Sequence, residues 1–389
     1  MSEKVAIIAS GQTNHCSKRS DVNIPEMIKE AVDRALLQAG ITLDDIDAVV
    51  IGNMEHFEGI NLSDMWAAEG AGSVLKPAMK IATGGTTGAS VGACAYYHCA
   101  SGLFDTVLAI GWEKLSEGDT TGGIITAFDP IVERMTLAGA VGGLAIEATQ
   151  YIKTYNVPEE TIALAAVRAR KNAQKNPHAH LKLELTVQQV LESPYIAYPI
   201  HYLDMCPTSD GACAVIMASE KRAKQLCTRP AWIKAVVCRH NHAWIGDVFF
   251  DDYTVEHQST LASAAIEAYR IAGINDPLHE LDVIEFYDPA SYTLVAWLEY
   301  LQLCPRGQGR RLVEEGVTAM QGDLPVNPSG GVVSTNPIGA TALIRLAEAS
   351  LQLQGRAGER QVDGVRTALS TGFGGSYWNE VFILSEKAD

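Results

Sequence analysis

A glycine turn at the start of a helix is the feature of this sequence best suited to chemistry. The stretch KIATGGTTGASVGACAYYHCASGLFDTVLAIG, residues 80–111, reads as a short strand, a turn, a helix and a second strand. Gly84 and Gly85 leave the backbone bare where the helix begins, so free amides and the helix dipole can hold an oxyanion. The turn contains no strong nucleophile. Covalent catalysis at this turn would therefore need a nucleophile from elsewhere.

Two further residues could act on a substrate. Tyr287 lies in EFYDPAS, and its phenol, with an ordinary pKa near 10, is a proton donor at neutral pH and a poor base unless a neighbour lowers that pKa. The alternative is a tyrosine that fills the end of a core strand with its hydroxyl bonded. Asn336 in STNPIGAT donates or accepts hydrogen bonds but does not titrate, which suits an oxyanion hole better than proton transfer.

Alternating strands and helices must position these residues. KVAIIAS is a buried strand, PEMIKEAVDRALLQAG an amphipathic helix between a proline and a glycine, and IDAVVIGN the next strand, which predicts a layered α/β fold. The segment 30–53 can be laid on 263–288, with Ala-Gly-Ile after each helix and Asp47 or Asp282 before each strand. This repeat favours two halves of one topology, as an internal duplication would leave. A chance likeness of two helix-strand units is the alternative.

The chain divides accordingly into a first half, 1–219, and a second half, 230–389. Residues 113–198, rich in Gly and Thr and then helical, interrupt the alternation, so we expect an inserted loop region that packs on the first half.

Composition limits the class of protein. The 389 residues are 47% hydrophobic and 20% charged, which is typical of a globular protein. The eight cysteines form no CxxC pair and the chain opens without an apolar signal, so we expect a reduced, cytoplasmic protein. No uninterrupted apolar run is long enough to span a membrane, and a net charge of -16 argues against nucleic acid.

The cysteines and paired histidines suggest structural roles. We expect Cys94, Cys99, Cys206 and Cys213 to be core residues, the common fate of cysteine in helices and strands. His240 and the histidine two positions later have metal-like spacing, but two ligands are too few for zinc, so we expect no metal in this chain.

Several motifs in order carry a resemblance over nearly the whole chain. The glycine turn is followed by GWEKLSEG at 111–118, CPTSDGACAVI at 206–216, NPSGGVVSTNPIGAT at 327–341 and STGFGG at 370–375. Together they resemble the thiolase superfamily, and within it the sterol-carrier-protein type of thiolase and the related thiolase-like aldolases. The resemblance implies a five-layered αβαβα fold built from two similar halves, a homodimer, and carbon–carbon chemistry on a coenzyme A thioester.

The sequence departs from the family at its catalytic positions. Gly85 stands at the position of the nucleophilic Cys, Tyr287 at the His of the HD motif, Asn336 at the His of the GHP motif, and Ser370 or Thr371 at the acid-base Cys. Thiolysis of a β-keto acyl-CoA by coenzyme A in a catabolic pathway is favoured slightly, because GWEKLSEG and the central region look more like degradative thiolases. Retro-aldol cleavage of a β-hydroxy acyl-CoA and an inactive acyl-CoA-binding scaffold are the alternatives.

The resemblance also suggests binding groups and partners. Backbone donors to an oxyanion are expected at Gly84, Gly331 and Gly374. Two basic clusters are expected to meet the phosphates of coenzyme A, since the chain as a whole is acidic. Their candidate residues are Arg168, Arg170, Lys171, Arg222 and Lys224. A small partner subunit combining a zinc ribbon with an OB-fold is also expected, and any zinc would belong to it.

Overall fold

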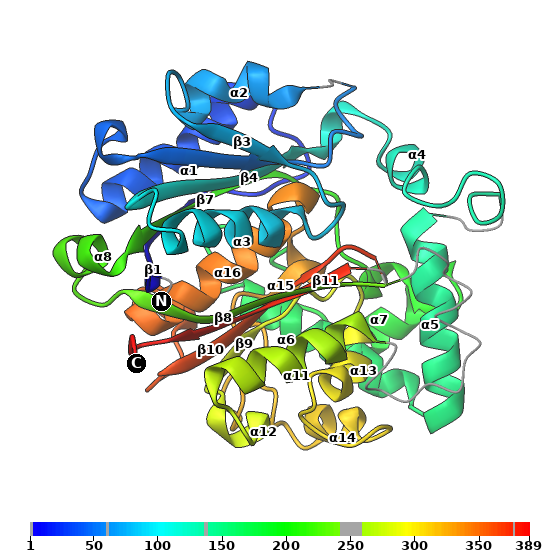
Figure 1. Ribbon diagram of the computed structural model, residues 1–389. Helices are drawn as coiled ribbons and strands as arrows, with labels where there is room; N and C mark the ends of the chain where they lie inside the picture. Colours follow the sequence, from blue (N-terminus) through cyan, green and yellow to red (C-terminus); the bar gives the residue numbers. More distant parts are fainter. Residues whose placement is uncertain (1–2, 60–61, 136–138, 242–258, 376–377) are drawn as a thin grey trace.

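The fold is built on one mixed sheet of nine strands (Figure 1). The computed structural model describes residues 3–59, 62–135, 139–241, 259–375 and 378–389. Within these residues the strand order is β3-β2-β4-β7-β1-β8-β11-β10-β9. The N-terminal part consists of β1 (Val5–Gln12), β2 (Ala48–Gly52), β3 (Ala78–Ile81), β4 (Thr106–Lys114) and β7 (Asp210–Ser219). The C-terminal part consists of β8 (Ala231–His240), β9 (Val283–Glu285), β10 (Thr367–Phe373) and β11 (Trp378–Ser385).

The two parts of the sheet repeat one topology. In the first, β2 is parallel to β4, β4 antiparallel to β7, and β7 antiparallel to β1. In the second, β9 is parallel to β10, β10 antiparallel to β11, and β11 antiparallel to β8. A short antiparallel pairing of β1 with β8 joins them. The prediction of two similar halves is therefore confirmed.

The two aspartates of the sequence repeat have the same role in each half. Asp47 Oδ2 accepts from the amides of Asp105 (2.9 Å) and Thr106 (2.8 Å), where β4 begins. Asp282 Oδ2 accepts from the amides of Arg366 and Thr367, both at 2.8 Å, where β10 begins. Each carboxylate thus fixes the start of the strand that lies parallel to its own, which explains why the repeat keeps an acid at this position.

The two parts of the sheet form two layers, and helices outside and between them form three more, which gives five layers in all. The outer helices α1 (Ile24–Ala39) and α2 (Ser63–Ala71) cover the N-terminal strands, and α11 (Thr260–Ala272) covers the C-terminal strands (Figure 1). Between the two parts of the sheet lie α3 (Thr87–Ala100) and α16 (Ile338–Gln354). These two helices approach closely because Gly88 has no side chain: a Cβ there would fall 2.4 Å from the backbone nitrogen of Leu343. The predicted αβαβα fold is confirmed.

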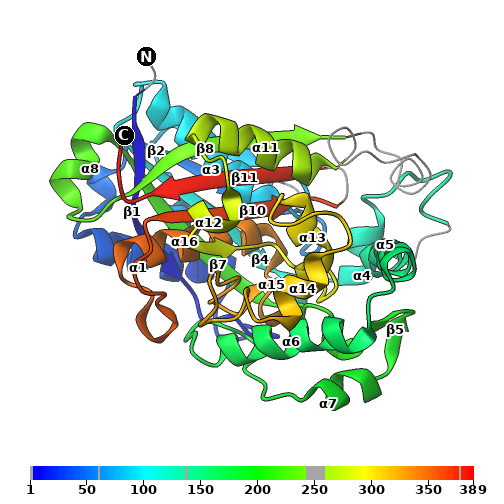
Figure 2. The same ribbon diagram turned by 90° about the horizontal axis from the view of Figure 1, so that it is seen from below.

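The inserted region packs differently from our expectation. It comprises α4 (Thr120–Ile125), α5 (Gly139–Tyr155), α6 (Glu159–Ala173), α7 (Val187–Glu192), β5 (Tyr195–Ala197) and β6 (Ile200–His201). We expected it to pack on the first half, but α6 packs against helices of the second half (Figure 2). The reason is apolar burial, since Ile162 and Ala165 of α6 share one core with Val295 and Trp297.

The remaining elements are short. After β7 comes α8 (Glu220–Leu226), and the second half adds α12 (Pro277–Glu280), α13 (Thr293–Tyr300), α14 (Gly309–Glu314) and α15 (Gly331–Ser334). Single 3-10 turns are η1 (Leu43–Asp45), η2 (Leu115–Glu117), η3 (Tyr202–Asp204) and η4 (Gly358–Arg360). In the described part of the chain, no helix combines the length and apolar character needed to cross a bilayer.

Candidate active site

A cavity of about 280 Å³ lies where the N-termini of α3 and α16 meet the insertion. Predicted residues from three distant segments line it: Gly84 and Gly85 before α3, Tyr287 after β9, and Asn336 before α16. The remaining walls are mostly apolar side chains of the insertion and its approach, including Leu115, Ile124, Phe128 and Leu144. An apolar cavity with a few convergent polar groups is typical of a small-molecule site.

The hydroxyl of Tyr287 lies beside the position where the family carries its nucleophile. A Cβ built on Gly85 would fall 3.4 Å from Tyr287 Oη and 2.5 Å from the carbonyl oxygen of Phe373. Residue 85 therefore has no room for a side chain unless the end of β10 moves. The phenol, rather than a residue of the turn, offers a reactive group to this part of the cavity.

Burial sets the protonation of Tyr287. The side chain is only 3% exposed, and its backbone amide donates to Thr371 Oγ1 at 2.9 Å. Loss of hydration raises the pKa of the phenol well above its usual range, and the nearby Cys206 adds to this, while the hydroxyl of Thr341 acts in the opposite direction. Tyr287 is consequently a phenol, not a phenolate, at neutral pH.

A hydrogen-bonded row holds Asn336 toward the cavity. Thr341 Oγ1 donates to Asn336 Oδ1 at 2.8 Å, and Asn336 Nδ2 donates to Cys206 Sγ at 3.3 Å. Since the acceptor oxygen of the amide is taken by Thr341, the Nδ2 group is the donor available to a substrate oxygen. Thr341 interacts with both predicted catalytic side chains, Tyr287 and Asn336.

Cys206 lines this cavity, contrary to the expectation that it is a core residue. Burial raises the pKa of its thiol to about 12, with a further contribution from Asp288, so it is not a thiolate nucleophile at neutral pH. Cys99 and Cys213 are buried as expected, whereas Cys94 is only partly buried.

The aspartate next to Tyr287 fixes the following glycine-rich loop. Asp288 Oδ1 accepts from the amide of Val332 at 2.6 Å, and burial raises the pKa of this carboxyl to about 7. Gly331 has φ +67° and a Cβ there would fall 2.5 Å from both carboxylate oxygens of Asp288. Gly331 does not line the cavity. It therefore makes space for Asp288 rather than presenting an amide to a substrate.

Two other predicted site residues are engaged elsewhere. Ser370 is 1% exposed within β10 and is not part of the cavity lining, so its hydroxyl does not face a molecule bound in this cavity. Gly374 lines the cavity, but its amide donates to the carbonyl of Trp378 at 2.7 Å. The expected oxyanion donor at Gly374 is thus already used by the β10–β11 connection.

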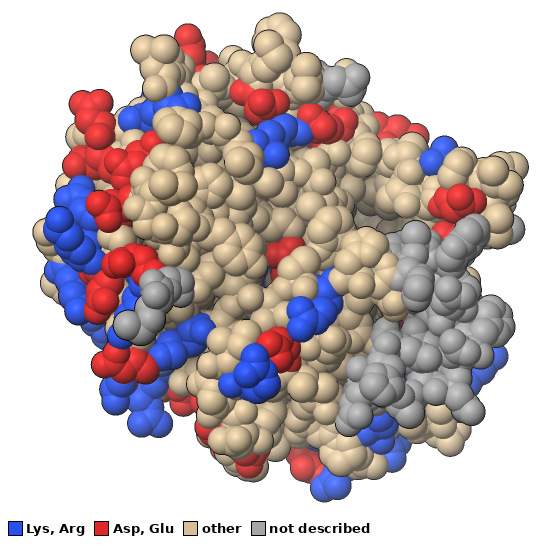
Figure 3. All heavy atoms as spheres, viewed as in Figure 1, with Lys and Arg blue, Asp and Glu red and all other residues tan. Residues whose placement is uncertain are grey.

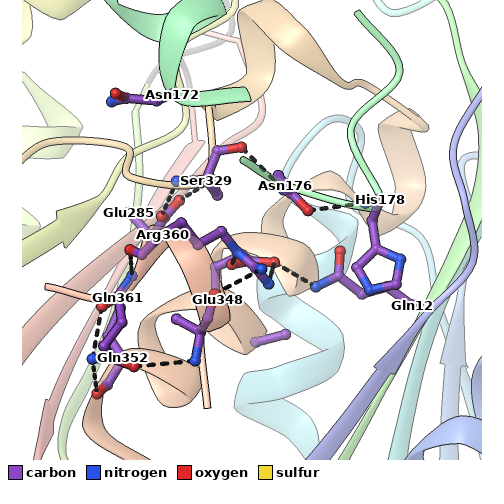
Figure 4. Close-up of polar contacts among 12 residues, drawn as sticks. Gln12, Asn172, Asn176, His178, Glu285, Ser329, Glu348, Gln352, Arg360 and Gln361 are labelled. Carbon is purple, nitrogen blue, oxygen red and sulfur yellow. Dashed lines mark hydrogen bonds and ion pairs between the residues drawn. The ribbon is translucent and has the colours of Figure 1, made fainter. Parts of the chain in front are cut away.

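A buried charge network supports β9, the strand that precedes Tyr287, and Figure 4 shows Glu285, Ser329, Glu348 and Arg360 of this network. Glu285 accepts from the amide of Ser329 at 3.0 Å, from its hydroxyl at 2.7 Å, and from Arg345 at 2.6 Å. One turn after Arg345 on α16, Glu348 forms a two-pronged ion pair with Arg360 of η4, at 2.7 and 3.0 Å. Glu285 at the end of β9 thus binds both Ser329 of the NPSGG loop and Arg345 of α16, and it holds these three segments together because a buried charge that loses its partner is costly.

The two basic clusters do not form one coenzyme A patch. Arg170 is 1% exposed and donates to the carbonyl of Met205 at 3.1 Å, and half-buried Arg168 donates to the carbonyl of Val313. Lys171 is exposed on α6. Arg222 and Lys224 lie on α8, at the end of the molecule far from α4 and α5, where basic and acidic groups intermingle (Figures 1 and 3). Arg222 pairs with Asp45 and the exposed Lys224 pairs with Glu220, as on a solvated helix face, and neither basic residue lines the cavity.

No group of three or more His, Cys, Asp or Glu side chains in the described residues could hold a metal ion. His240 ends β8 and its ring packs edge-on against Trp378, with 4.9 Å between centroids. Its predicted companion at position 242 lies outside the described residues.

Comparison with known proteins agrees with this fold. A family model described as the thiolase N-terminal domain matches residues 5–192, and one described as thiolase C-terminal domain-like matches residues 250–386. The acetyl-CoA acetyltransferase of Methanothermobacter thermautotrophicus is 31% identical, with 96% of both chains covered. The chain belongs to the thiolase family.

Two further likenesses place the chain within that family. Sterol carrier protein 2 of Gallus gallus is 28% identical over 97% of this chain and 71% of its own length. The solved structure titled Ltp2-ChsH2(DUF35) aldolase superposes with a TM-score of 0.83 at 23% identity, covering 99% of this chain and 98% of that one. The predicted membership of the thiolase superfamily is confirmed, and the chain is similar in sequence to sterol carrier protein 2 and in fold to this aldolase.

Sequence reasoning missed three residues at the site. Thr341 and Cys206 belong to quoted motifs, and Thr341 lies five positions after Asn336 in the same motif, in the first turn of α16. Glu113 of GWEKLSEG is buried, and its Oε2 accepts from the amides of Met54 and Gly339, both at 3.0 Å. Burial and the neighbouring Glu58 raise its pKa. The motif therefore caps the first turn of α16 beside the cavity.

Proposed function

We propose that the protein acts on acyl-CoA thioesters by retro-aldol cleavage, or the reverse condensation, of a β-hydroxy acyl-CoA. The observation that carries the proposal is the phenol of Tyr287 beside Gly85. Acyl transfer through residue 85 needs a nucleophile that a glycine does not supply. A retro-aldol step needs only a group that exchanges a proton with the β-oxygen and donors for an enolate oxygen.

The residues take the following roles in cleavage. Tyr287, as phenolate, removes the proton from the β-hydroxyl; the bond between the α and β carbons breaks, and the β carbon becomes a ketone or aldehyde. The electron pair of that bond forms the enolate of the shortened acyl-CoA. Asn336 Nδ2 and backbone amides at the start of α3 stabilise the enolate oxygen. The proton held by Tyr287 then returns to the α carbon, and in condensation each step runs backwards.

Thiolysis of a β-keto acyl-CoA by free coenzyme A is the second candidate. The likeness to the archaeal acetyl-CoA acetyltransferase favours it. In this route the coenzyme A thiolate attacks the β-ketone directly, and Asn336 stabilises the resulting oxyanion, so no acyl-enzyme forms at residue 85. The same enolate leaves as in retro-aldol cleavage.

One assay separates the two reactions and the inactive scaffold. The purified protein is incubated with β-hydroxy and β-keto acyl-CoAs, with and without free coenzyme A, and the products are identified by mass. Retro-aldol cleavage gives a shortened acyl-CoA and a free carbonyl compound without added coenzyme A. Thiolysis gives two acyl-CoAs and requires it. Binding without any product in the complete assembly would indicate a scaffold.

We also propose a homodimer formed at the edge of the sheet. The edge strand β3 leaves Met79 47% exposed, and α2 beside it exposes Met65 (70%) and Trp66 (69%). Large apolar side chains gathered beside an unpaired edge strand are typical of a protein interface. Light scattering on the protein as it elutes from a size-exclusion column should give twice the mass of the chain. The variant Trp66→Glu should shift the measured mass toward that of the monomer.

A small subunit with a zinc ribbon and an OB-fold is proposed as a further partner. The support is the likeness to an aldolase whose title names a DUF35 component. The chain expressed alone should be soluble and poorly active, and co-expression with an adjacent small reading frame should restore activity. Full turnover by the isolated, zinc-free chain would argue against this partner.

A further inference from the structure

A second cavity of about 200 Å³ lies behind the candidate active site. It is enclosed by α5, the start of α11, and α13. Three tyrosines and one tryptophan line it: Tyr151, Tyr155, Tyr300 and Trp297. Neither the proposed reaction nor the sequence motifs account for this concentration of rings around one space.

Phe373 connects the two cavities. Its side chain lines both of them. Its ring centroid lies 5.8 Å from that of Tyr287 on one side and 4.7 Å from that of Trp297 on the other. A row of aromatic rings thus runs from the proposed catalytic phenol into the second cavity, and an acyl chain that follows Phe373 would pass from one to the other.

The size of the cavity fits one six-membered ring. A dry cavity of about 150 Å³ in a protein core is known to take up benzene. The second cavity is somewhat larger and has room for a ring with a small substituent. Aromatic walls favour a ring over a flexible chain of equal carbon number, because stacked and edge-on contacts add to simple burial and the ring has less freedom to lose.

Arg306 supplies a polar contact for that substituent. Its guanidinium carbon lies 4.6 Å over the ring of Tyr300, and its buried NH1 atom has no hydrogen-bond partner in the described part of the chain. The other charged group, Glu147, already accepts from Tyr292 at 3.0 Å and Trp297 at 2.9 Å. A buried donor without a partner is costly, so an acceptor oxygen of a bound molecule that reaches this nitrogen would stabilise the complex.

We propose that this second cavity binds the distal end of the acyl group, and that this end carries a six-membered ring with an oxygen acceptor directed at Arg306. The proposal rests on the proposed function, since it assigns the acyl part of the same substrate. It names the class of substrate as ring-bearing acyl-CoA thioesters rather than straight-chain ones.

Binding of unreactive thioesters tests the proposal apart from the reaction. The affinity for 5-phenylpentanoyl-CoA is compared with that for undecanoyl-CoA, which has the same number of acyl carbons, by titration calorimetry on the complete assembly. Neither has a β-oxygen, so neither can be cleaved. The ring compound should bind about tenfold more tightly. Equal affinities would overturn the proposal.

Two variants locate the preference. Ala296→Phe fills the cavity and should abolish the preference for the ring while affinity for undecanoyl-CoA stays within about twofold. Arg306→Gln should weaken binding of 5-(4-hydroxyphenyl)pentanoyl-CoA by about tenfold and leave binding of 5-phenylpentanoyl-CoA unchanged. The control Arg311→Gln, at an exposed position of α14, should change neither affinity. An unchanged ring preference in Ala296→Phe, or equal effects of the two arginine variants, would overturn the assignment.

Failure of this proposal and failure of the proposed function give different results. If the protein prefers the ring thioesters but cleaves no β-hydroxy or β-keto acyl-CoA, the second cavity is supported as a binding site and the proposed reaction is refuted. If the protein cleaves straight-chain substrates and shows no preference for a ring, the proposed reaction is supported and the proposed role of the second cavity is refuted.

Discussion

Replacing Tyr287 by Phe tests the proposed reaction most directly. The change removes one hydroxyl and keeps the ring that packs against Phe373. It removes the titratable hydroxyl that lies beside Gly85 in the cavity. If that phenol exchanges a proton with the β-oxygen, its loss should lower the turnover of a β-hydroxy acyl-CoA by about a hundredfold or more.

The pH dependence gives the same test a second readout. Burial raises the pKa of Tyr287, so the phenolate that cleavage requires is scarce at neutral pH and becomes more abundant as pH rises. Between roughly pH 7 and 9, the cleavage rate of the unsubstituted protein should therefore increase about tenfold for each increase of one pH unit. The residual rate of Tyr287→Phe should not show this increase.

Stability should change little, which separates a chemical role from a packing role. The hydroxyl interacts with Thr341, and the loss of one such contact costs about 1 kcal/mol. Tyr269→Phe is the matched control, because Tyr269 is also buried, its hydroxyl donates to the carbonyl of Leu301 at 2.9 Å, and it lines neither cavity. This control should lose similar stability and keep its turnover. A decrease below threefold for Tyr287→Phe, with the pH slope retained, would refute the assignment of the phenol.

Four other substitutions have definite expected outcomes. Gly85→Ala places a Cβ 2.5 Å from the carbonyl oxygen of Phe373, so turnover should fall at least about tenfold and the melting temperature should fall too; unchanged turnover would contradict the role of the turn. Ser370→Ala should leave turnover within about twofold, as measured by the same mass assay, because this side chain does not reach the cavity. Burial raises the pKa of the Glu380 carboxyl from its ordinary 4.5 to about 7, so folding stability should fall as pH rises from 4.5 to 7, by on the order of 3 kcal/mol, and Glu380→Gln should flatten this dependence in denaturant titrations. Arg360→Met leaves the Glu348 carboxylate buried without its cation and should cost about 3–5 kcal/mol of unfolding free energy, and a cost below about 1 kcal/mol would contradict the importance of the pair.

Local patterns were sufficient for the elements and for the symmetry of the fold. Apolar runs bounded by glycine and proline predicted the strands and helices, and the repeat of Ala-Gly-Ile followed by an aspartate predicted two similar halves. Asp47 and Asp282 show why the repeat predicted the symmetry, because each accepts hydrogen bonds from two successive amides at the start of a neighbouring parallel strand. Such contacts repeat with the sequence, since they depend on one turn and one strand.

Contacts between distant segments could not be predicted in the same way. The sequence did not indicate that α6 packs on the second half, because an apolar helix face shows that it is buried but not against what. The basic clusters had the same limitation, since charge along the chain does not show that Arg170 is buried or that α8 lies far from the cavity.

The sequence by itself determined that residue 85 has no nucleophile, that Tyr287 and Asn336 replace titratable family residues, and that the chain folds as two similar halves. These are matters of residue identity and of short-range pattern. Only the tertiary structure decided that the phenol of Tyr287 lies beside Gly85, that Thr341 contacts both proposed catalytic side chains, and that an aromatic cavity continues behind Phe373. Those arrangements depend on how α3, α16 and the insertion pack around the sheet. Packing is set by contacts between residues hundreds of positions apart, which no local pattern records.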